Sequence, residues 1–252
     1  MKKYTKMNAK IFDQWINEGW KWGIPISDET YNRAKLGDFE ILLTPNKPVP
    51  KDWIGILKGK KVLGLASGGG QQMPVFQALG AKVVCLDISK KQLQTEKEFA
   101  TKMGYHIELI EADMTDDLPF KDETFDMIFH PVSNVYVEHV EPVFKEAFRI
   151  LKKGGVLLSG LDNGINFAFD ETDGKLMFNL PFNPLKDKKQ YDYMIKNDYG
   201  IQFSHSIENQ IGGQLKAGFV LVDIYEDTND SGYLKEQNIP TFYATKAIKP
   251  LK

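Results

Sequence analysis

Residues 60–162 alternate short apolar runs with stretches of helical pattern, and this alternation restricts the possible folds more than any other feature. Five of these runs are rich in leucine or β-branched residues and have the length of strands, namely 60–66, 81–88, 106–112, 125–132 and 154–162. Strands that alternate with helices form parallel sheets through crossover connections. The sequence therefore predicts an α/β fold around a mostly parallel sheet.

Helix-end signals between these runs support the same fold. Ser89 and Gln92 form a capping box that opens a helix over 89–104, and the last residue of that range is a glycine suited to end it. A second amphipathic pattern predicts a helix over 143–155 that stops at Gly154. Both helices lie where crossover connections are needed.

The C-terminal part predicts how the sheet ends. A helix over 206–218 is followed by two strand-like runs, 219–227 and 241–248, which we expect to pair antiparallel at one edge. The complete expectation is a Rossmann-like, doubly wound, mostly parallel seven-stranded sheet with an antiparallel C-terminal strand.

Two further segments lie outside this regular pattern. Residues 1–58 are expected to form an N-terminal helical lid or appendage, with a helix over 9–22 that carries Trp15, Trp20 and Trp22. Residues 59–252 then form the main domain. Within it, residues 163–203 show little periodicity but contain eight aromatic residues, which is typical of an ordered loop with a function. We interpret this segment as an insertion that covers a substrate.

Composition excludes several classes of partner. The net charge is −2, and the chain lacks the long basic runs of nucleic-acid-binding proteins. No stretch approaches the roughly 20 apolar residues that span a bilayer, so membrane insertion is not expected. The single cysteine, Cys85, lies in an apolar run and suits a buried strand in a reducing compartment. We expect a cytoplasmic protein that acts on small molecules.

The first strand run leads into three consecutive glycines, Gly68 to Gly70, and then into a helix expected to begin near Gln71. In open parallel sheets, glycines at the first strand-to-helix turn let a nucleotide-like ligand approach the backbone. Asp87 follows 21 residues after Ala66, at the end of the second strand, where an acid can accept both ribose hydroxyls. This order predicts an adenosine-containing cofactor, either NAD or S-adenosylmethionine.

The third and fourth strand runs carry a resemblance to a known family. Asp113 directly follows the third run, an acidic loop comes next, and Phe125 and Asp126 open the fourth. With the glycine turn and Asp87, this pattern resembles the class I S-adenosylmethionine-dependent methyltransferases. It is similar in particular to the small-molecule group, methyltransferase type 11, that includes the ubiquinone and menaquinone biosynthesis enzymes.

The resemblance implies a cofactor, S-adenosyl-L-methionine, with S-adenosyl-L-homocysteine as its product, and a role for each matching residue. The residues implied to bind the cofactor are Ala66, Ser67, Gly68, Gly70, Asp87, Ile88, Asp113, Met114 and His130. The glycine turn would lie against the methionine part, Asp87 against the ribose, Asp113 and Met114 against the adenine, and His130 near the reactive methyl. Two positions depart from the family pattern, because Gly64 and Ala66 replace its usual acid and first glycine.

The sequence does not single out one catalytic residue. Methyl transfer is an in-line displacement, which needs a general base only if the acceptor enters protonated. His130, His139 and His205 are the candidates, since imidazole titrates in the required range. Glu138 and His139 match part of a metal-binding pattern, but Val135 replaces its first acid, so no metal is expected. Two alternatives stay open, an NAD(P)-dependent oxidoreductase and a non-catalytic S-adenosylmethionine-binding protein.

Overall fold

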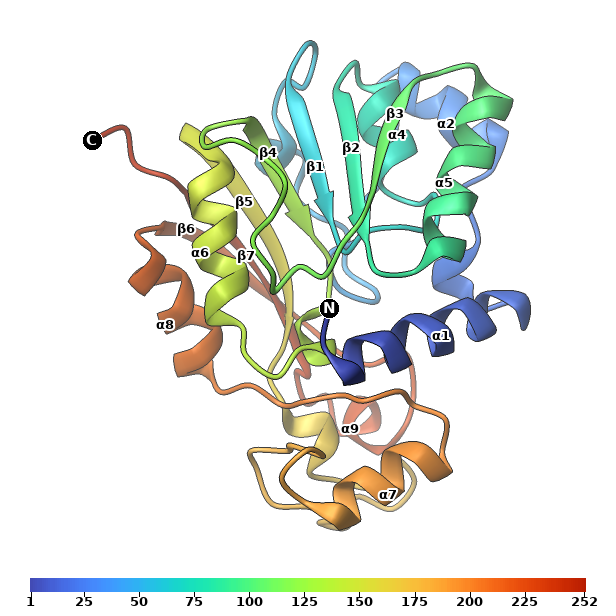
Figure 1. Ribbon diagram of the computed structural model, residues 1–252, viewed down its shortest axis with the longest axis vertical. Coiled ribbons are helices and arrows are strands. Elements are labelled where there is room, and N and C mark those ends of the chain that lie inside the picture. Colours follow the sequence, from blue (N-terminus) through green and yellow to red (C-terminus); the bar gives the residue numbers. More distant parts are fainter.

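The computed structural model describes all 252 residues and contains one seven-stranded sheet (Figure 1). Its order is β3-β2-β1-β4-β5-β7-β6. The strands are β1 (Lys61–Leu65), β2 (Lys82–Asp87), β3 (Ile107–Glu111), β4 (Phe125–His130), β5 (Leu151–Asp162), β6 (Val220–Asp227) and β7 (Phe242–Ile248). Strands β1 to β5 are parallel, and β7 runs antiparallel to both β5 and β6. The predicted fold class and the antiparallel C-terminal pairing are confirmed.

Helices cover both faces of the sheet, as a doubly wound fold requires. One face carries α2 (Asp28–Lys35), α3 (Lys51–Ile54), α4 (Met73–Ala78) and α5 (Lys90–Met103), and the other carries α6 (Glu141–Ile150) and α8 (Ile207–Ala217). In Figure 1, α2, α4 and α5 lie to the right of the sheet, and α6 and α8 lie to its left. None of the helices combines the length and apolar character needed to cross a membrane.

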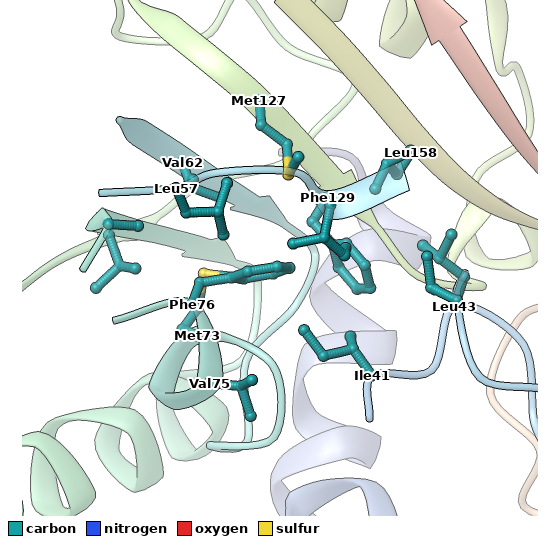
Figure 2. Close-up of a cluster of buried hydrophobic side chains, with 14 of the residues drawn as sticks. Ile41, Leu43, Leu57, Val62, Met73, Val75, Phe76, Met127, Phe129 and Leu158 are labelled. Atoms are coloured by element: carbon teal, nitrogen blue, oxygen red, sulfur yellow. The ribbon is translucent and has the colours of Figure 1, made fainter. Parts of the chain in front are cut away.

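The N-terminal residues take part in the main core. Ile41, Leu43 and Trp53 are buried in the same cluster as residues of β1, β2 and β4. Figure 2 shows Ile41 and Leu43 beside Phe129, whose ring meets that of Phe76 edge to face at 5.0 Å. Burying apolar side chains of this size contributes about 2 kcal/mol each. Residues 41–53 therefore stabilise the same core as the parallel strands.

A third layer lies across the carboxyl ends of the parallel strands, at the bottom of Figure 1. It contains α1 (Lys3–Asn17), α7 (Lys188–Lys196), α9 (Tyr233–Glu236) and the short 3₁₀ turns η1 (Lys21–Gly23), η2 (Asn134–Tyr136) and η3 (Ile165–Phe167). Tyr4 of α1 packs with Phe182 and Phe203 in a small buried cluster. The Asn8 side chain also donates to the Ile201 carbonyl (2.9 Å) and accepts from its amide (2.7 Å). The start of the chain and residues 163–203 thus pack together.

The helix ends predicted from cap residues for α5 and α8 agree with the structure. Ser89 accepts from the Gln92 amide at the start of α5, and Ser206 accepts from the Asn209 amide at the start of α8. Gly104 and Gly218 end these helices in the left-handed conformation that glycine adopts without strain.

Two predicted helices have different bounds. The helix expected over 9–22 is wrong at both ends, since α1 begins at Lys3 and ends at Asn17. Gly19, at φ +86°, reverses the chain there. Trp20 and Trp22 therefore lie beyond the helix, although Trp20 still packs on Trp15 at 5.2 Å.

The helix expected over 143–155 is also wrong beyond Ile150, because Leu151 already pairs with Phe125 of β4 and begins β5. Sheet pairing overrides the helical pattern at this point.

Two other local expectations change. The helix after the glycine turn, α4, begins at Met73 rather than near Gln71 and spans six residues. The segment 163–203, expected as a loop, contains the regular helix α7. Asp187 starts α7 by accepting from the Lys189 and Gln190 amides, and Met194 anchors it in the small buried cluster.

Candidate active site

The three glycines of the turn after β1 are packed against other parts of the same chain. A side chain at Gly68 would place its Cβ 2.5 Å from the Gln92 Cβ, and one at Gly69 would lie 2.3 Å from the Trp22 carbonyl oxygen. A Cβ at Gly70 would meet the Pro25 Cβ at 2.6 Å. The glycines therefore let α5 and residues 22–25 approach the turn closely.

One departure from the family pattern has a packing reason. A Cβ at Gly64 would lie 2.7 Å from the sulfur and terminal methyl of Met73. Met73 is fully buried, so it fills the space that an acidic side chain at position 64 would need. Ala66 adopts a positive φ of 53°, and Ser67 donates to the Gln72 side chain at 3.1 Å.

Asp87 lies at the carboxyl end of β2 and faces this turn. One carboxylate oxygen accepts from the Gly68 amide (3.0 Å) and the other from the Ser89 amide (2.9 Å). Burial raises the pKa of Asp87 to about 6, although these backbone bonds act in the opposite direction. Each carboxylate oxygen can accept a further bond. Asp87 can therefore bind two hydroxyl donors while the protein holds it in place.

A cavity of about 510 Å³ extends from this turn across the carboxyl ends of the strands. Four of the residues predicted to bind cofactor line it: Ala66, Ser67, Gly68 and Asp87. Its walls also include Trp20, Lys21 and Trp22 from the N-terminal part. At the other end it is lined by aromatic residues of segment 163–203, among them Phe167, Phe182 and Tyr193. Segments that are far apart in the sequence thus line the same cavity.

The remaining predicted cofactor residues do not line this cavity. The Gly70 amide is buried and donates to Glu96 of α5 at 2.8 Å. Asp113 is buried under α1, where it accepts from the Thr5 hydroxyl (2.8 Å) and from Thr115. Burial raises the pKa of Asp113, but bonds from Thr115 and Thr5 outweigh it and lower the pKa overall.

Ile88 and Met114 likewise lie outside the cavity lining. Two residues of α1 contact this part of the chain: Thr5 donates to Asp113, and Asp13 accepts from Ser89, which follows Ile88. The adenine-side role of Ile88, Met114 and Asp113 stays a prediction.

The three candidate histidines do not meet in one place. His130 is buried outside the cavity, with Nδ1 2.9 Å from the Leu65 carbonyl and Nε2 2.9 Å from the Asn134 side-chain oxygen. Burial lowers its pKa and so favours the neutral ring. His205 is also buried, and its Nε2 donates to the carbonyls of Asn134 and Val137. Both imidazoles are engaged in holding the chain after β4.

His139 is exposed, and its Nε2 lies 3.9 Å from a Glu138 carboxylate oxygen. Both residues line a second, polar cavity of about 390 Å³ that His205 also borders. No group of three or more His, Cys, Asp and Glu side chains is arranged to hold a metal ion. None of the three histidines lines the main cavity.

Asp162 is a cavity residue that the sequence reasoning missed. It ends β5 and is 3% exposed, and burial raises its pKa to about 6. Its carboxylate accepts from the Gly164 amide and the Asn166 side chain. The rule that singled out Asp87, an acid at the carboxyl end of a parallel strand, also applies to this residue.

Comparison with known proteins identifies the chain. A family model described as a methyltransferase domain matches residues 63–159. The uncharacterized methyltransferase YbaJ of Bacillus subtilis is 43% identical over 249 residues, covering 96% of this chain and 97% of the relative. The chain belongs to the class I S-adenosylmethionine-dependent methyltransferases. The resemblance inferred from the sequence is confirmed.

Two other similar proteins agree with this methyltransferase assignment. The ubiquinone/menaquinone biosynthesis C-methyltransferase UbiE of Cronobacter sakazakii is 29% identical over 187 residues, covering 70% of this chain and 73% of the relative. The crystal structure of an S-adenosylmethionine-dependent methyltransferase from Mesorhizobium loti has the same fold. It is 18% identical with a TM-score of 0.62, covering 79% of this chain and 94% of that one. The oxidoreductase alternative has no support among them.

The cofactor of this methyltransferase is S-adenosylmethionine, and the structure offers a site that fits it. The cavity begins at the glycine turn, and Asp87 presents a buried carboxylate there with remaining acceptor capacity. When bound, the cofactor supplies an electrophilic methyl group. The part of the cavity beyond the turn is then available to a second molecule.

Proposed function

We propose that this methyltransferase transfers the methyl group of S-adenosylmethionine to a small, partly apolar molecule held in the main cavity. One observation carries the proposal: a single space joins Asp87 and the glycine turn to the aromatic side chains of segment 163–203. A displacement reaction needs its two reactants aligned and shielded from water. A cavity with a polar end and an aromatic end suits that task.

Different residues bind different parts of the cofactor in this proposal. Asp87 binds the ribose hydroxyls, and Ser67 and Gly68 hold the methionine part of the cofactor. His130 acts through the protein, because it keeps Asn134 and the end of β1 in place. His139 and His205 have no role in the main cavity.

The cover over the cavity comes from residues 1–58 and 163–203. Trp20 and Trp22 form one wall, and the aromatic residues of the second segment form another. Together they exclude water from the acceptor. A small-molecule acceptor is supported by the UbiE relative, which is named for ubiquinone and menaquinone biosynthesis. A cytoplasmic location stays a prediction that agrees with Cys85, a buried free thiol in β2.

The first experiment measures cofactor binding by calorimetry with S-adenosylmethionine, S-adenosylhomocysteine and NAD in parallel. We expect binding of both sulfur compounds and no response to NAD. Binding of NAD alone would contradict the proposal. Turnover is then tested with S-adenosylmethionine labelled in its methyl group and a small-molecule extract, with labelled products detected by mass spectrometry. Absence of any labelled product, despite cofactor binding, would favour the non-catalytic alternative.

A further inference from the structure

The charges around the main cavity are strongly one-sided. Five charged side chains line it, of which four are acidic: Asp87, Asp162, Glu171 and Asp230. The one cation, Lys21, forms an ion pair with Asp230, and both side chains are about half exposed. The buried Asp87 and Asp162, and the exposed Glu171, therefore have no cationic partner among the lining residues. An anionic molecule would be repelled there, and a cationic one attracted.

Asp162 occupies the end of the cavity away from the ribose-binding position. Three inter-strand steps separate β2 from β5 in the sheet order, and each step is about 4.8 Å, so the ends of these strands lie roughly 14 Å apart. This separation places Asp162 beyond the position proposed for the ribose. Asp162 is therefore placed to contact the acceptor.

The Asp162 carboxylate is held rigidly by the chain that follows β5. Gly164 donates its amide to one oxygen, and Asn166 donates to the other at 3.0 Å. Asn166 is itself fixed by a bond from the Asn229 side chain at 2.8 Å. A carboxylate oxygen accepts two hydrogen bonds, so each retains one free position. The group is preorganised to accept from a bound molecule.

Several aromatic residues line the same cavity as this carboxylate. Phe242 pairs directly opposite Asp162 across β5 and β7, so the two side chains lie on the same face of the sheet. Segment 163–203 adds five further aromatic residues to the cavity lining: Phe167, Phe169, Phe182, Tyr193 and Tyr199. Aromatic faces attract cations, most strongly where water is excluded. Carboxylate and rings together form a site for a positive charge attached to an apolar body.

We propose that the methyl acceptor is a primary or secondary amine on an apolar body, and that Asp162 binds its ammonium group and accepts its proton. The inference rests on the proposed function and names its substrate class. The proton passes from nitrogen to a carboxylate oxygen of Asp162, which frees the nitrogen lone pair. A nitrogen–carbon bond then forms as the sulfur–carbon bond breaks, and its electron pair stays on sulfur in S-adenosylhomocysteine. Asp162 afterwards releases the proton to water.

The proton affinity of Asp162 agrees with this role. Burial raises its pKa to about 6, so the carboxylate is ionised at pH 7.5 and can still accept a proton more readily than an ordinary aspartate.

The test uses three probes with the same aromatic body and different charge: 2-phenylethylamine, 2-phenylethanol and 3-phenylpropionate. Their binding to the full chain is measured by calorimetry at pH 7.5 with saturating S-adenosylhomocysteine. Asp162→Asn removes the charge with little change in shape. Asp230→Asn is the matched control, because it removes a carboxylate from the rim of the same cavity. Thermal unfolding and S-adenosylhomocysteine binding establish that each variant is folded.

We expect the amine to bind wild type at least about tenfold more tightly than the alcohol, and the carboxylate to bind most weakly. Asp162→Asn is expected to abolish the preference for the amine, and Asp230→Asn to retain it. Equal binding of the three probes, or no binding of the amine at millimolar concentration, would overturn the inference. An equal loss of preference in both variants would also overturn it. Failure of S-adenosylhomocysteine to bind wild type would instead contradict the proposed function.

Discussion

Replacing Glu96 by Gln is expected to change how the stability of the protein depends on pH. Glu96 lies in α5 behind the glycine turn, is 0% exposed, and accepts from the Gly70 amide at 2.8 Å. Burial raises its pKa from 4.5 to about 8. The bond from Gly70 opposes this shift, and the nearby Asp87 carboxylate adds to it. Glutamine retains the shape and the acceptor oxygen but cannot ionise.

The sign and size of the effect follow from proton linkage. Between pH 4.5 and about 8, the native state keeps a proton on Glu96 that the unfolded chain has lost. The contribution of this group to stability is fully present below pH 4.5 and is lost as the pH rises through about 8, by about 1.4 kcal/mol per pH unit. Over the whole interval the loss is roughly 5 kcal/mol. The glutamine variant avoids it.

The assay is urea unfolding at pH 5, 6, 7 and 8, followed by tryptophan fluorescence. We expect Glu96→Gln to match wild type near pH 5 and to exceed its free energy of unfolding by several kcal/mol at pH 8. Glu98→Gln is the control, since Glu98 is exposed on the same helix. Asp87 and Asp162 titrate in all three proteins, so the difference between variants reports on Glu96. Parallel pH curves for all three proteins would refute the reasoning.

Three further substitutions test the site and its cover. Asp87→Asn is expected to weaken S-adenosylhomocysteine binding at least about tenfold, because bonds to a charged acceptor contribute roughly 1.5–3 kcal/mol each; unchanged calorimetric affinity would remove Asp87 from the cofactor site. Gly69→Ala is expected to cost more than about 2 kcal/mol in urea unfolding, because the new Cβ would lie 2.3 Å from the Trp22 carbonyl oxygen. Gly59→Ala is the control, because Gly59 has a similar positive φ but no atom within 4 Å of an added Cβ. It should therefore cost clearly less free energy of unfolding. An equal cost in both variants would assign the effect to backbone strain alone. Asn8→Ala removes two buried hydrogen bonds and should cost about 2 kcal/mol. It should also speed limited proteolysis within residues 163–203, and an unchanged cleavage rate would show that α1 does not hold that segment.

The elements that sequence predicted best are those specified by local signals. The cap residues Ser89, Gly104, Ser206 and Gly218 act through bonds within one or two turns, and their helices begin or end where expected. The predicted end of the helix over 143–155 was wrong because Leu151 pairs with Phe125 of β4. This pairing is a long-range contact that no local sequence pattern contains.

The same distinction applies to the site. Gly68 and Asp87 follow from the strand-end rule, and Ala66 and Ser67 from the family resemblance; all four line the cavity. The aromatic segment 163–203 was expected to cover a substrate, but the sequence did not show which of its rings line the cavity, because that depends on long-range packing. The three histidines were chosen for their expected place near the carboxyl face and for their titration range, whereas burial and hydrogen bonds direct two of them into the protein. Asp162 also meets the strand-end rule, since it ends the parallel strand β5, but the rule was applied only to the second strand.

The paired bonds between Asn8 and Ile201 have a consequence for the exchange of bound molecules. Because they tie α1 to the end of segment 163–203, neither element can move away from the cavity alone without breaking both bonds. A ligand that leaves on this side needs both elements to move together or the tie to open first. The residence time of the ligand would then depend on the free energy of that opening as well as on the contacts of the ligand with the cavity. Slow dissociation would therefore not by itself show a high intrinsic affinity.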